Sequence, residues 1–310
     1  MTTFGRLLNI TLLTVAAIAP LAGQSEGRIV QPIDEGWLFR LADTPDEQQP
    51  PAPDAPDWRE VSVPHDWSIE GPYSPDAPTG RGGGYLPAGV GWYVKTIEIP
   101  ASWRGRTVFI EFDGVMAHSD VWLNGEHLSH RPYGYSSFRC DLTPHLNWEG
   151  ENTIVVRADN SRQPASRWYT GAGIYRHVRI VVTDPVHIDQ WGVFVTTPEV
   201  RDDRATVRVQ TDIVNTTGAD REVALTTAIE SPDGREVAAG QHVEVVPAGI
   251  TRRIIQVFEI PDPQRWDLDT PRLYTAVSRV TSDGRIHDNQ RTRFGIREFE
   301  FRADTGFWIN

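Results

Sequence analysis

The amino-acid sequence predicts an all-β protein, a jelly-roll β-sandwich followed by an immunoglobulin-like β-sandwich. Three observations support this fold class. Apolar and polar residues alternate with a period of two over many short segments, which is typical of half-buried strands. The chain carries 26 glycines and 23 prolines, enough to separate short strands by frequent turns. Its 310 residues are sufficient for two domains, and the first half shows no convincing helical period.

The first sandwich is expected over residues 24–184. Its clearest signal is Asn124-Gly125 between two short strand-like segments. This pair supplies the two positive φ angles of a type I′ turn and so predicts a tight hairpin. Loops rich in proline or glycine interrupt the pattern at 44–57 and 71–91. The expected extended segments are 31–40 with Ile33, Trp37 and Phe39 as apolar anchors, 92–99, 107–112, 121–123, 126–128, 153–158 and 177–182.

The second sandwich is expected over residues 185–298, after a boundary at Asp184-Pro185. Turns at 217–218, 232–234 and 282–284 separate segments of cleaner alternation. About seven short strands over this length fit an immunoglobulin-like sandwich without the antibody disulfide. The clearest strand segments are 207–213, 223–229, 243–245, 254–260 and 274–280.

The charge and cysteine content exclude several functions. A formal net charge of −12, from 42 acidic and 30 basic residues, argues against binding nucleic acid, because that needs clustered lysine and arginine. The only cysteine, Cys140, cannot form an intramolecular disulfide and is expected to be a small buried hydrophobic residue. The 11 tryptophans suit a protein that handles carbohydrate, although most single tryptophans are core residues.

Residues 1–23 have the order of a secretory signal peptide. Arg6 precedes an apolar stretch at 7–22, and small residues lead up to Gly23. The stretch falls short of the roughly 20 apolar residues of a membrane span. A periplasmic or secreted protein is therefore expected, with no membrane attachment after cleavage.

Six segments form an ordered set of motifs. They are Val63-Pro64-His65-Asp66-Trp67, Gly91-Trp92-Tyr93-Val94-Lys95, Val121-Trp122-Leu123-Asn124-Gly125, and the stretches 167–176, 266–274 and 294–297. The first four resemble the sugar-binding domain of glycoside hydrolase family 2, and the last two resemble its immunoglobulin-like domain. The resemblance is closest to bacterial β-galactosidases, while β-glucuronidases and β-mannosidases share the architecture.

The resemblance implies a galactose-binding-like first sandwich and a (β/α)8 catalytic barrel after the second. In the family, two glutamates of that barrel act as acid/base and as nucleophile in a retaining mechanism. Neither glutamate can be placed in this sequence, so no catalytic residue is assigned and the chain alone is expected to be inactive. Residues 299–310 are expected to begin the missing barrel, which makes the chain a truncated amino-terminal portion.

The resemblance also assigns substrate-binding residues. Asp159 corresponds to a family aspartate that reaches the active-site edge, where its carboxylate contacts sugar hydroxyls or a cation. Asn160, Arg167 and Trp168 complete the expected set. An alternative is that Asp159 closes a turn after a strand, and that Arg167 and Trp168 pack against the barrel. No metal or cofactor is expected in this chain, although a cation near the active site of the full-length enzyme is left open.

Other signals are less specific. His65-Asp66 looks like half of a catalytic dyad but is expected to cap a loop and anchor Trp67. The glycine run 82–84 lacks the Gly-Lys-Ser/Thr ending of a phosphate-binding loop. The histidines at positions 118, 127 and 130 lack zinc-ligand spacing.

The expected function is therefore the non-catalytic amino-terminal portion of an exported retaining hydrolase that acts on β-galactosides. Its expected partners are a β-galactoside and the catalytic barrel, and a homo-oligomer is left open. Two alternatives remain: a stand-alone exported carbohydrate-binding protein, or the scaffold domains of a β-glucuronidase or β-mannosidase.

Overall fold

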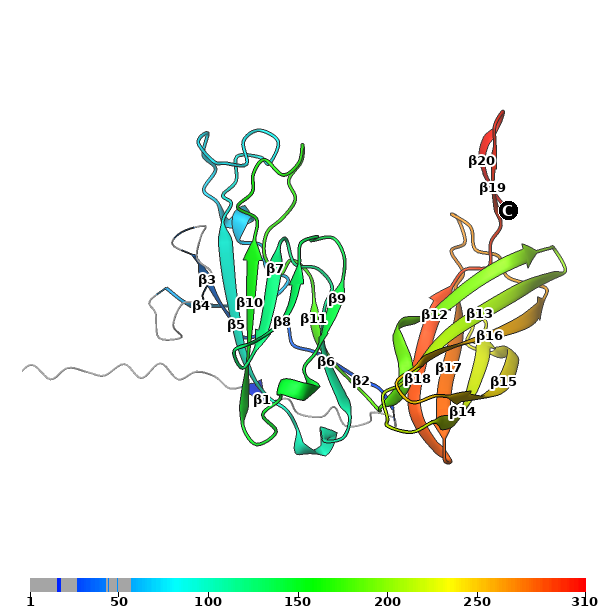
Figure 1. Ribbon diagram of the computed structural model, residues 1–310. Helices are drawn as coiled ribbons and strands as arrows, with labels where there is room; N and C mark the ends of the chain where they lie inside the picture. The colour runs from blue at the N-terminus through cyan, green and yellow to red at the C-terminus, as the bar shows by residue number, and fades with distance from the viewer. Residues whose placement is uncertain (1–15, 18–26, 43, 45–48, 50–56) are drawn as a thin grey trace, which may run out of the picture. The chain divides into compact units, whose positions relative to one another are not determined.

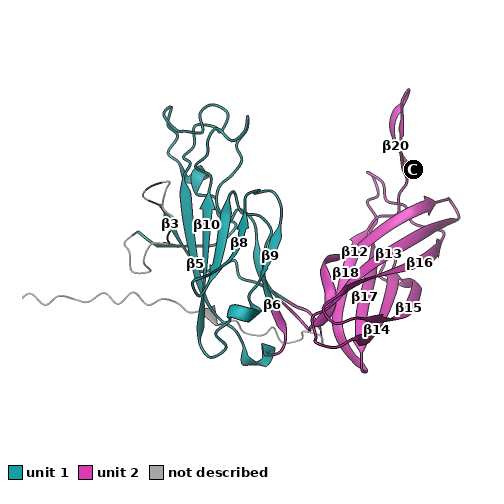
Figure 2. Cartoon of the chain, in the orientation of Figure 1, with its two compact units in different colours: residues 1–21, 30–104, 108–181 teal, residues 22–29, 105–107, 182–310 magenta. Residues whose placement is uncertain are grey.

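The computed structural model describes residues 16–17, 27–42, 44, 49 and 57–310. The expected signal peptide lies outside the described residues except for Ala16 and Ala17, and so does most of the loop 44–57. Contacts divide the chain into two compact units (Figure 2). The first holds Val30–Arg104 and Val108–Val181, and the second holds Val182–Asn310, Gly105–Thr107 and the described residues 27–29. Within the described residues, no helix has the length and apolarity needed to cross a membrane.

The first unit is a sandwich of a seven-stranded and a four-stranded sheet (Figure 1). The larger sheet has the order β4-β3-β5-β10-β7-β8, with β1 beside β5, and the smaller has the order β2-β11-β6-β9. This two-sheet arrangement agrees with the expected jelly-roll. The strands are β1 (Ala16–Ala17), β2 (Ile29–Pro32), β3 (Trp37–Leu41), β4 (Arg59–Val61), β5 (Val90–Glu98), β6 (Thr107–Phe112), β7 (Ser119–Leu123), β8 (Glu126–Arg131), β9 (Phe138–Asp141), β10 (Glu151–Asp159) and β11 (Val178–Thr183). The helical turns are η1 (Trp67–Glu70), η2 (Ala101–Trp103) and η3 (Thr143–His145).

Alternating residues of β10 build the core of the first unit. Ile154, Val156 and Ala158 are fully buried and their neighbours along the strand face the other way, as a period of two requires. The predicted hairpin is confirmed, because Asn124 and Gly125 have φ angles of 52° and 87° between β7 and β8. These positive angles match the twist of the flanking strands, so the turn sets the pairing of the hairpin.

The second unit is a sandwich of a three-stranded sheet, β12-β13-β16, and a four-stranded sheet, β15-β14-β17-β18. Together these sheets supply the strands expected of an immunoglobulin-like fold. The expected segments did not include β12 or β18, and the chain ends in a separate hairpin, β19-β20. The strands are β12 (Val186–Val200), β13 (Arg204–Asn215), β14 (Arg221–Glu230), β15 (Glu236–Val246), β16 (Thr251–Pro261), β17 (Tyr274–Ser282), β18 (Arg285–Phe294), β19 (Phe299–Arg302) and β20 (Gly306–Ile309).

Buried ion pairs tie short upstream segments into this second unit. Asp288 is fully buried and accepts hydrogen bonds from Arg28 at 2.9 and 3.2 Å and from the backbone N–H of Ile188 at 2.8 Å. Asp184, which is also buried, lies 3.0 Å from a guanidinium nitrogen of Arg106. Arg285 and His287 of β18 each approach the other oxygen of Asp184 to 3.0 Å. Both carboxylates are thus paired, as burial of a charge requires.

Candidate functional site

Three loops gather at one end of the first unit (Figure 1). They are residues 71–89 before β5, 132–137 between β8 and β9, and 160–177 between β10 and β11. The antiparallel register explains this, because Asp159 at the end of β10 lies opposite Val90 at the start of β5. In the same way, the end of β8 lies opposite the start of β7. We call this set of three loops the loop end.

Side-chain hydrogen bonds join the three loops to one another. The amide oxygen of Asn160 accepts from the Gly89 backbone N–H at 2.8 Å, and its amide nitrogen donates to the Gly171 carbonyl at 3.4 Å. The Tyr175 hydroxyl donates to the Gly134 carbonyl at 2.8 Å. Asn160 is buried, so its side chain holds loops together, and a role in substrate binding stays a prediction.

Asp159 is the last residue of β10 and borders the loop end. One carboxylate oxygen lies 3.1 Å from the Arg157 guanidinium, and the other accepts from the Ser161 backbone N–H at 2.9 Å. The second bond is the turn-closing contact that formed the alternative interpretation. The carboxylate retains 14% side-chain exposure and unused lone pairs, so it can still accept a hydrogen bond from a sugar hydroxyl.

A cation beside Asp159 has no ready ligand set. Its carboxylate already pairs with the positive Arg157, which would repel a metal ion. In the described part of the chain, no three histidine, cysteine or acidic side chains are grouped so that they could hold a metal ion. The described residues alone thus offer no cation site, and the cation near the active site of the full-length enzyme stays a prediction.

Arg167 and Trp168 are exposed on the loop that follows β10. The Trp168 side chain is 63% exposed, so most of its indole face is open to solvent. This loop contacts the glycine-rich loop, because a Cβ added at Gly82 would lie 2.9 Å from the Ser166 carbonyl oxygen. The loop that carries Arg167 and Trp168 therefore lies next to the segment 80–85.

His65 and Asp66 belong to a hydrogen-bonded network beneath the loop end. His65 Nδ1 lies 2.8 Å from the Tyr93 hydroxyl, and Nε2 lies 3.2 Å from a Glu70 carboxylate oxygen that faces it. Asp66 accepts from the Ser68 N–H at 3.0 Å, which caps η1, and from the Tyr169 hydroxyl at 2.5 Å. The expected capping role is confirmed, because Asp66 is the N-cap of η1.

Two glycines let aromatic rings pack tightly around this network. A Cβ at Gly173 would lie 2.1 Å from the Tyr93 hydroxyl oxygen, and one at Gly91 would lie 2.5 Å from the Trp67 ring. Real Cβ atoms do not approach so closely, so any side chain here would displace the aromatic cluster. The Gly-Trp-Tyr and Gly-Ala-Gly motifs are thus explained by packing.

Burial keeps the titratable groups of the network uncharged or paired. Burial lowers the pKa of His65, and this outweighs the opposing effect of Glu70. Burial and the hydrogen bond to Asp66 both raise the pKa of the Tyr169 hydroxyl. A neutral histidine and a protonated tyrosine suit a structural role, because neither group is poised to exchange a proton near neutral pH.

The remaining sequence candidates lie apart from this network. Asp120 accepts from His127 Nε2 and His130 Nδ1 at 2.9 Å each. A β-bulge between β7 and β8 brings the two histidines to one carboxylate, although residues three apart on a regular strand face opposite ways. Cys140 is buried as expected, and burial raises its pKa to about 11, which opposes thiolate chemistry.

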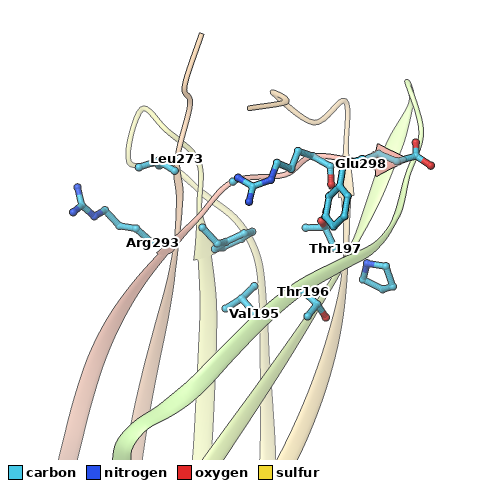
Figure 3. Close-up of a pocket in the computed structure, with 11 residues that line it drawn as sticks. Val195, Thr196, Thr197, Leu273, Arg293 and Glu298 are labelled. Carbon is cyan, nitrogen blue, oxygen red and sulfur yellow. The ribbon is translucent and has the colours of Figure 1, made fainter. Parts of the chain in front are cut away.

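The second unit carries an open hollow near its carboxyl-terminal end, which the sequence did not indicate. It has a volume of about 700 Å³ and lies between β12, the end of β18 and the start of β19. Figure 3 shows Val195, Thr196 and Thr197 on one side, with Leu273, Arg293 and Glu298 around the rim. Glu298 is its sole lining carboxylate among the described residues, so the hollow lacks the carboxylate pair of a glycosidase.

Comparison with known proteins matches both sandwiches. The family model of the glycosyl hydrolases family 2 sugar binding domain matches residues 30–185, and a second family 2 model matches residues 186–297. A β-galactosidase of Bacteroides ovatus is 43% identical over 274 residues, 88% of this chain and 32% of that protein. A putative β-glucuronidase of Formosa agariphila is 35% identical over 91% of this chain and 26% of its own length.

Solved structures agree with these matches. A glycosyl hydrolase family 2 member from Bacteroides cellulosilyticus has a TM-score of 0.82 and 36% identity, and covers 91% of this chain and 37% of its own. A β-glucuronidase from the same family has a TM-score of 0.83 and 30% identity, over 93% and 32% of the two chains. The fold and motifs thus define a protein built on a jelly-roll followed by an immunoglobulin-like sandwich. The chain belongs to glycoside hydrolase family 2, and it spans about a third of the length of these relatives.

Proposed function

We propose that this chain is the amino-terminal, non-catalytic portion of an exported retaining glycoside hydrolase that acts on β-galactosides. One observation carries the proposal: both family matches occur in order, while the chain spans 32% of the related β-galactosidase. The acid/base and the nucleophile would then be supplied by residues beyond position 310.

The hairpin β19-β20 supports a scaffolding role in a longer protein. Phe299, Phe301, Phe307 and Trp308 are all about half exposed or more, which is unusual for four aromatic side chains on one short hairpin. An apolar hollow of about 340 Å³ adjoins them, lined by Trp266, Leu268, Arg297, Phe299, Phe307 and Ile309. This surface suits contact with further residues of the same protein, with a barrel as the proposed partner.

The loop end supports carbohydrate as the ligand of the first unit. Asp159 offers a carboxylate to sugar hydroxyls, and Trp168 offers an open indole face on which a pyranose ring can stack. In the whole protein, this end would complete a substrate site whose reacting groups come from elsewhere.

Two measurements test the proposal. Sequencing the gene beyond codon 310 should reveal an open frame, in this or a shifted phase, that encodes a barrel. The purified 310-residue chain should not turn over nitrophenyl galactoside, glucuronide or mannoside. Turnover that survives repurification would contradict the non-catalytic assignment, and intergenic sequence after codon 310 would contradict the longer protein. Export is tested separately by sequencing the amino terminus of the mature protein, which should begin near residue 24.

A stand-alone exported carbohydrate-binding protein is the second candidate. The exposed aromatics of the loop end favour it, because they offer binding surface without a barrel. Isothermal titration with galactosides and plant polysaccharides distinguishes the stand-alone binding protein from the amino-terminal portion of a hydrolase. Millimolar or tighter binding by a soluble monomer favours the stand-alone protein. The scaffold is favoured if the 310-residue chain aggregates and a longer protein that includes the downstream residues does not. That outcome would equally fit the scaffold domains of a β-glucuronidase or β-mannosidase.

A further inference from the structure

The two sheets of the second unit have four edge strands in the part of the chain that the structure describes. Three of these edges carry features that hinder pairing with a further strand. The strand β12 is interrupted by register shifts at 188–193 and 196–199, and the pairing of β15 with β14 shifts at one end. The strand β18 is mostly polar and carries three arginines. Bulges and charged side chains are the usual protection of exposed sheet edges.

The fourth edge strand, β16, lacks the bulges and the polar character of the other three. Its 11 residues pair with β13 in a register without shifts, from Thr251 opposite Val214 to Pro261 opposite Arg204. Within the described residues, β13 is its only neighbour in the sheet, so no strand covers its other backbone edge (Figure 1). Proline occurs only at its last position. A long, regular edge of this kind is a template for another strand.

The outward side chains of β16 give this edge an apolar surface. Ile255 and Val257 are 46% and 60% exposed, while the residues between and beside them face the core. On the same face, the neighbouring β13 places Gln210 opposite Ile255 and Arg208 opposite Val257. Apolar side chains thus lie on the outermost strand and polar ones on the strand behind it. A protected edge has the opposite arrangement, with charge at its rim.

Opposite charges flank this apolar pair on the same face. Arg253 precedes it and Glu259 follows it, and both side chains are exposed. Arg253 donates through Nε and one Nη to Asp212 of β13 at 2.8 and 2.9 Å, and its other Nη can donate to a further carboxylate. Glu259 accepts from the Thr206 hydroxyl of β13 at 2.8 Å. The outer face of β16 therefore presents a cation, two apolar residues and an anion in order.

This order is self-complementary when two copies of β16 run antiparallel. With Gln256 on a two-fold axis, Arg253 lies opposite Glu259 of the second copy, and Ile255 lies opposite its Val257. The same contacts repeat on the other side of the axis, as a two-fold interface requires. Moving the axis to Ile255 would instead place Arg253 opposite Val257. Opposite-charge and apolar cross-strand pairs stabilise a sheet, so the register centred on Gln256 is favoured.

We propose that the open edge of β16 pairs with β16 of a second copy of this chain, antiparallel and centred on Gln256. The two three-stranded sheets then join into one sheet across the two-fold axis. This inference goes beyond the proposed function and depends on neither the ligand nor the catalytic part. A single pair of strands buries little area, so the dimer is expected to be weak and reversible.

Engineered cysteines in the 310-residue chain test the register. In I255C/V257C, each new thiol lies opposite one of the second copy, at about 4.5–5.5 Å between Cα atoms, which a disulfide can span. Within one strand, side chains two residues apart are separated by about 6.7 Å and point the same way, so they do not bridge. Mild oxidation should convert most of the double variant to a covalent dimer. I255C and V257C alone should give little, because their thiols meet only diagonally, about 7–8 Å apart.

Sedimentation equilibrium of the same chain tests the charges. The parent chain should show a reversible monomer–dimer equilibrium within about 10–500 µM, the weak range expected of a small interface. E259R sets an arginine against Arg253 of the second copy and should weaken dimerisation by about tenfold or more, because like charges replace an ion pair. R253E/E259R restores opposite charges and should recover part of the loss, since its new glutamate lies beside Asp212.

The matched control is E222R, which makes the same charge change on an exposed residue of β14, a strand with neighbours on both sides. It should leave the dimerisation constant unchanged. Far-ultraviolet circular dichroism and the urea midpoint establish that each variant folds.

Four outcomes would overturn the proposal. They are a parent chain that stays monomeric over the whole concentration range, equal cross-linking in the single and double cysteine variants, and association that E259R leaves unchanged but F301S/F307S abolishes. The third of these would assign association to the hairpin β19-β20. The fourth is a longer protein that includes the downstream residues and stays monomeric, because those residues would then cover β16. Each of these results leaves the proposed function intact, since turnover and the downstream gene sequence test it separately.

Discussion

The two sandwiches bury charged groups of opposite sign. The first buries two cations, Lys95 and Arg157, and joins distant segments by hydrogen bonds such as Tyr169 to Asp66 and His65 to Tyr93. The second buries two carboxylates, with Asp288 against Arg28 and Asp184 against Arg106. A buried charge that loses its partner costs far more than a lost neutral hydrogen bond. The comparison therefore separates a unit with buried cations from one with buried carboxylates.

The largest expected effect breaks the charge pair of the second unit. D288N removes the charge that faces Arg28 and should lower the free energy of unfolding by about 3–5 kcal/mol. Urea unfolding followed by tryptophan fluorescence measures it. D283N is the control: Asp283 is exposed in a turn, and asparagine tolerates its φ of 51°, so about 0.5 kcal/mol or less is expected. A D288N midpoint equal to that of the parent chain would show that the pair is not structural.

The next effect tests packing in the first unit. G173A places a Cβ 2.1 Å from the Tyr93 hydroxyl oxygen at a φ of 75° and should cost about 2–4 kcal/mol. G125A shares a positive φ, 87°, but its Cβ would meet nothing within 4 Å. It should cost about 1 kcal/mol, the conformational share alone. An equal loss of unfolding free energy in G173A and G125A would mean that the aromatic rings around Gly173 rearrange without destabilising the fold.

A smaller effect concerns pH and the histidine of the first unit. Burial lowers the pKa of His65, so the unfolded chain binds this proton more readily than the folded chain. The stabilisation is fully present above about pH 6.5, the unfolded value, and is lost as pH falls towards the folded pKa. The free energy of unfolding, measured by urea denaturation, should therefore fall between pH 7.5 and 5.5. The fall should be no more than about 1.4 kcal/mol per pH unit. H65Q should flatten that slope; an unchanged slope would assign the proton to another group.

The smallest effect on stability is expected at the loop end. W168A removes a mostly exposed side chain and should change the free energy of unfolding by about 0.5 kcal/mol or less. The same variant should weaken glycan binding measurably, because the stacking face is gone. A large loss of stability would instead place Trp168 in a packed environment. A small loss of stability together with weaker glycan binding would mark Trp168 as a binding residue and not a packing residue.

Local patterns in the sequence were sufficient for much of the fold. The Asn124-Gly125 turn and the alternation along 207–213 each depend on neighbouring residues, and the structure confirms the hairpin and β13. The strand β12 was missed because bulges near residues 188–199 break its period. The strand β18 is mostly polar, with few apolar residues to alternate.

The site was harder to predict than the fold. Asp159 borders the loop end and Trp168 lies exposed on it, and their roles in substrate binding stay predictions, whereas Asn160 is buried between loops. The bond between Tyr169 and Asp66 spans 103 positions, and nothing local in the sequence announces it.

The pairing of Arg28 with Asp288 has a consequence for synthesis. The two residues are 260 positions apart, so Arg28 leaves the ribosome long before its carboxylate partner exists. At the usual ~5–20 residues per second, that interval is roughly 13–50 seconds. A long sequence separation also slows the closing contact itself. The beginning of the described chain thus completes a domain whose last strands are made at its end, and a nascent chain halted before residue 288 would expose an unmatched guanidinium to chaperones.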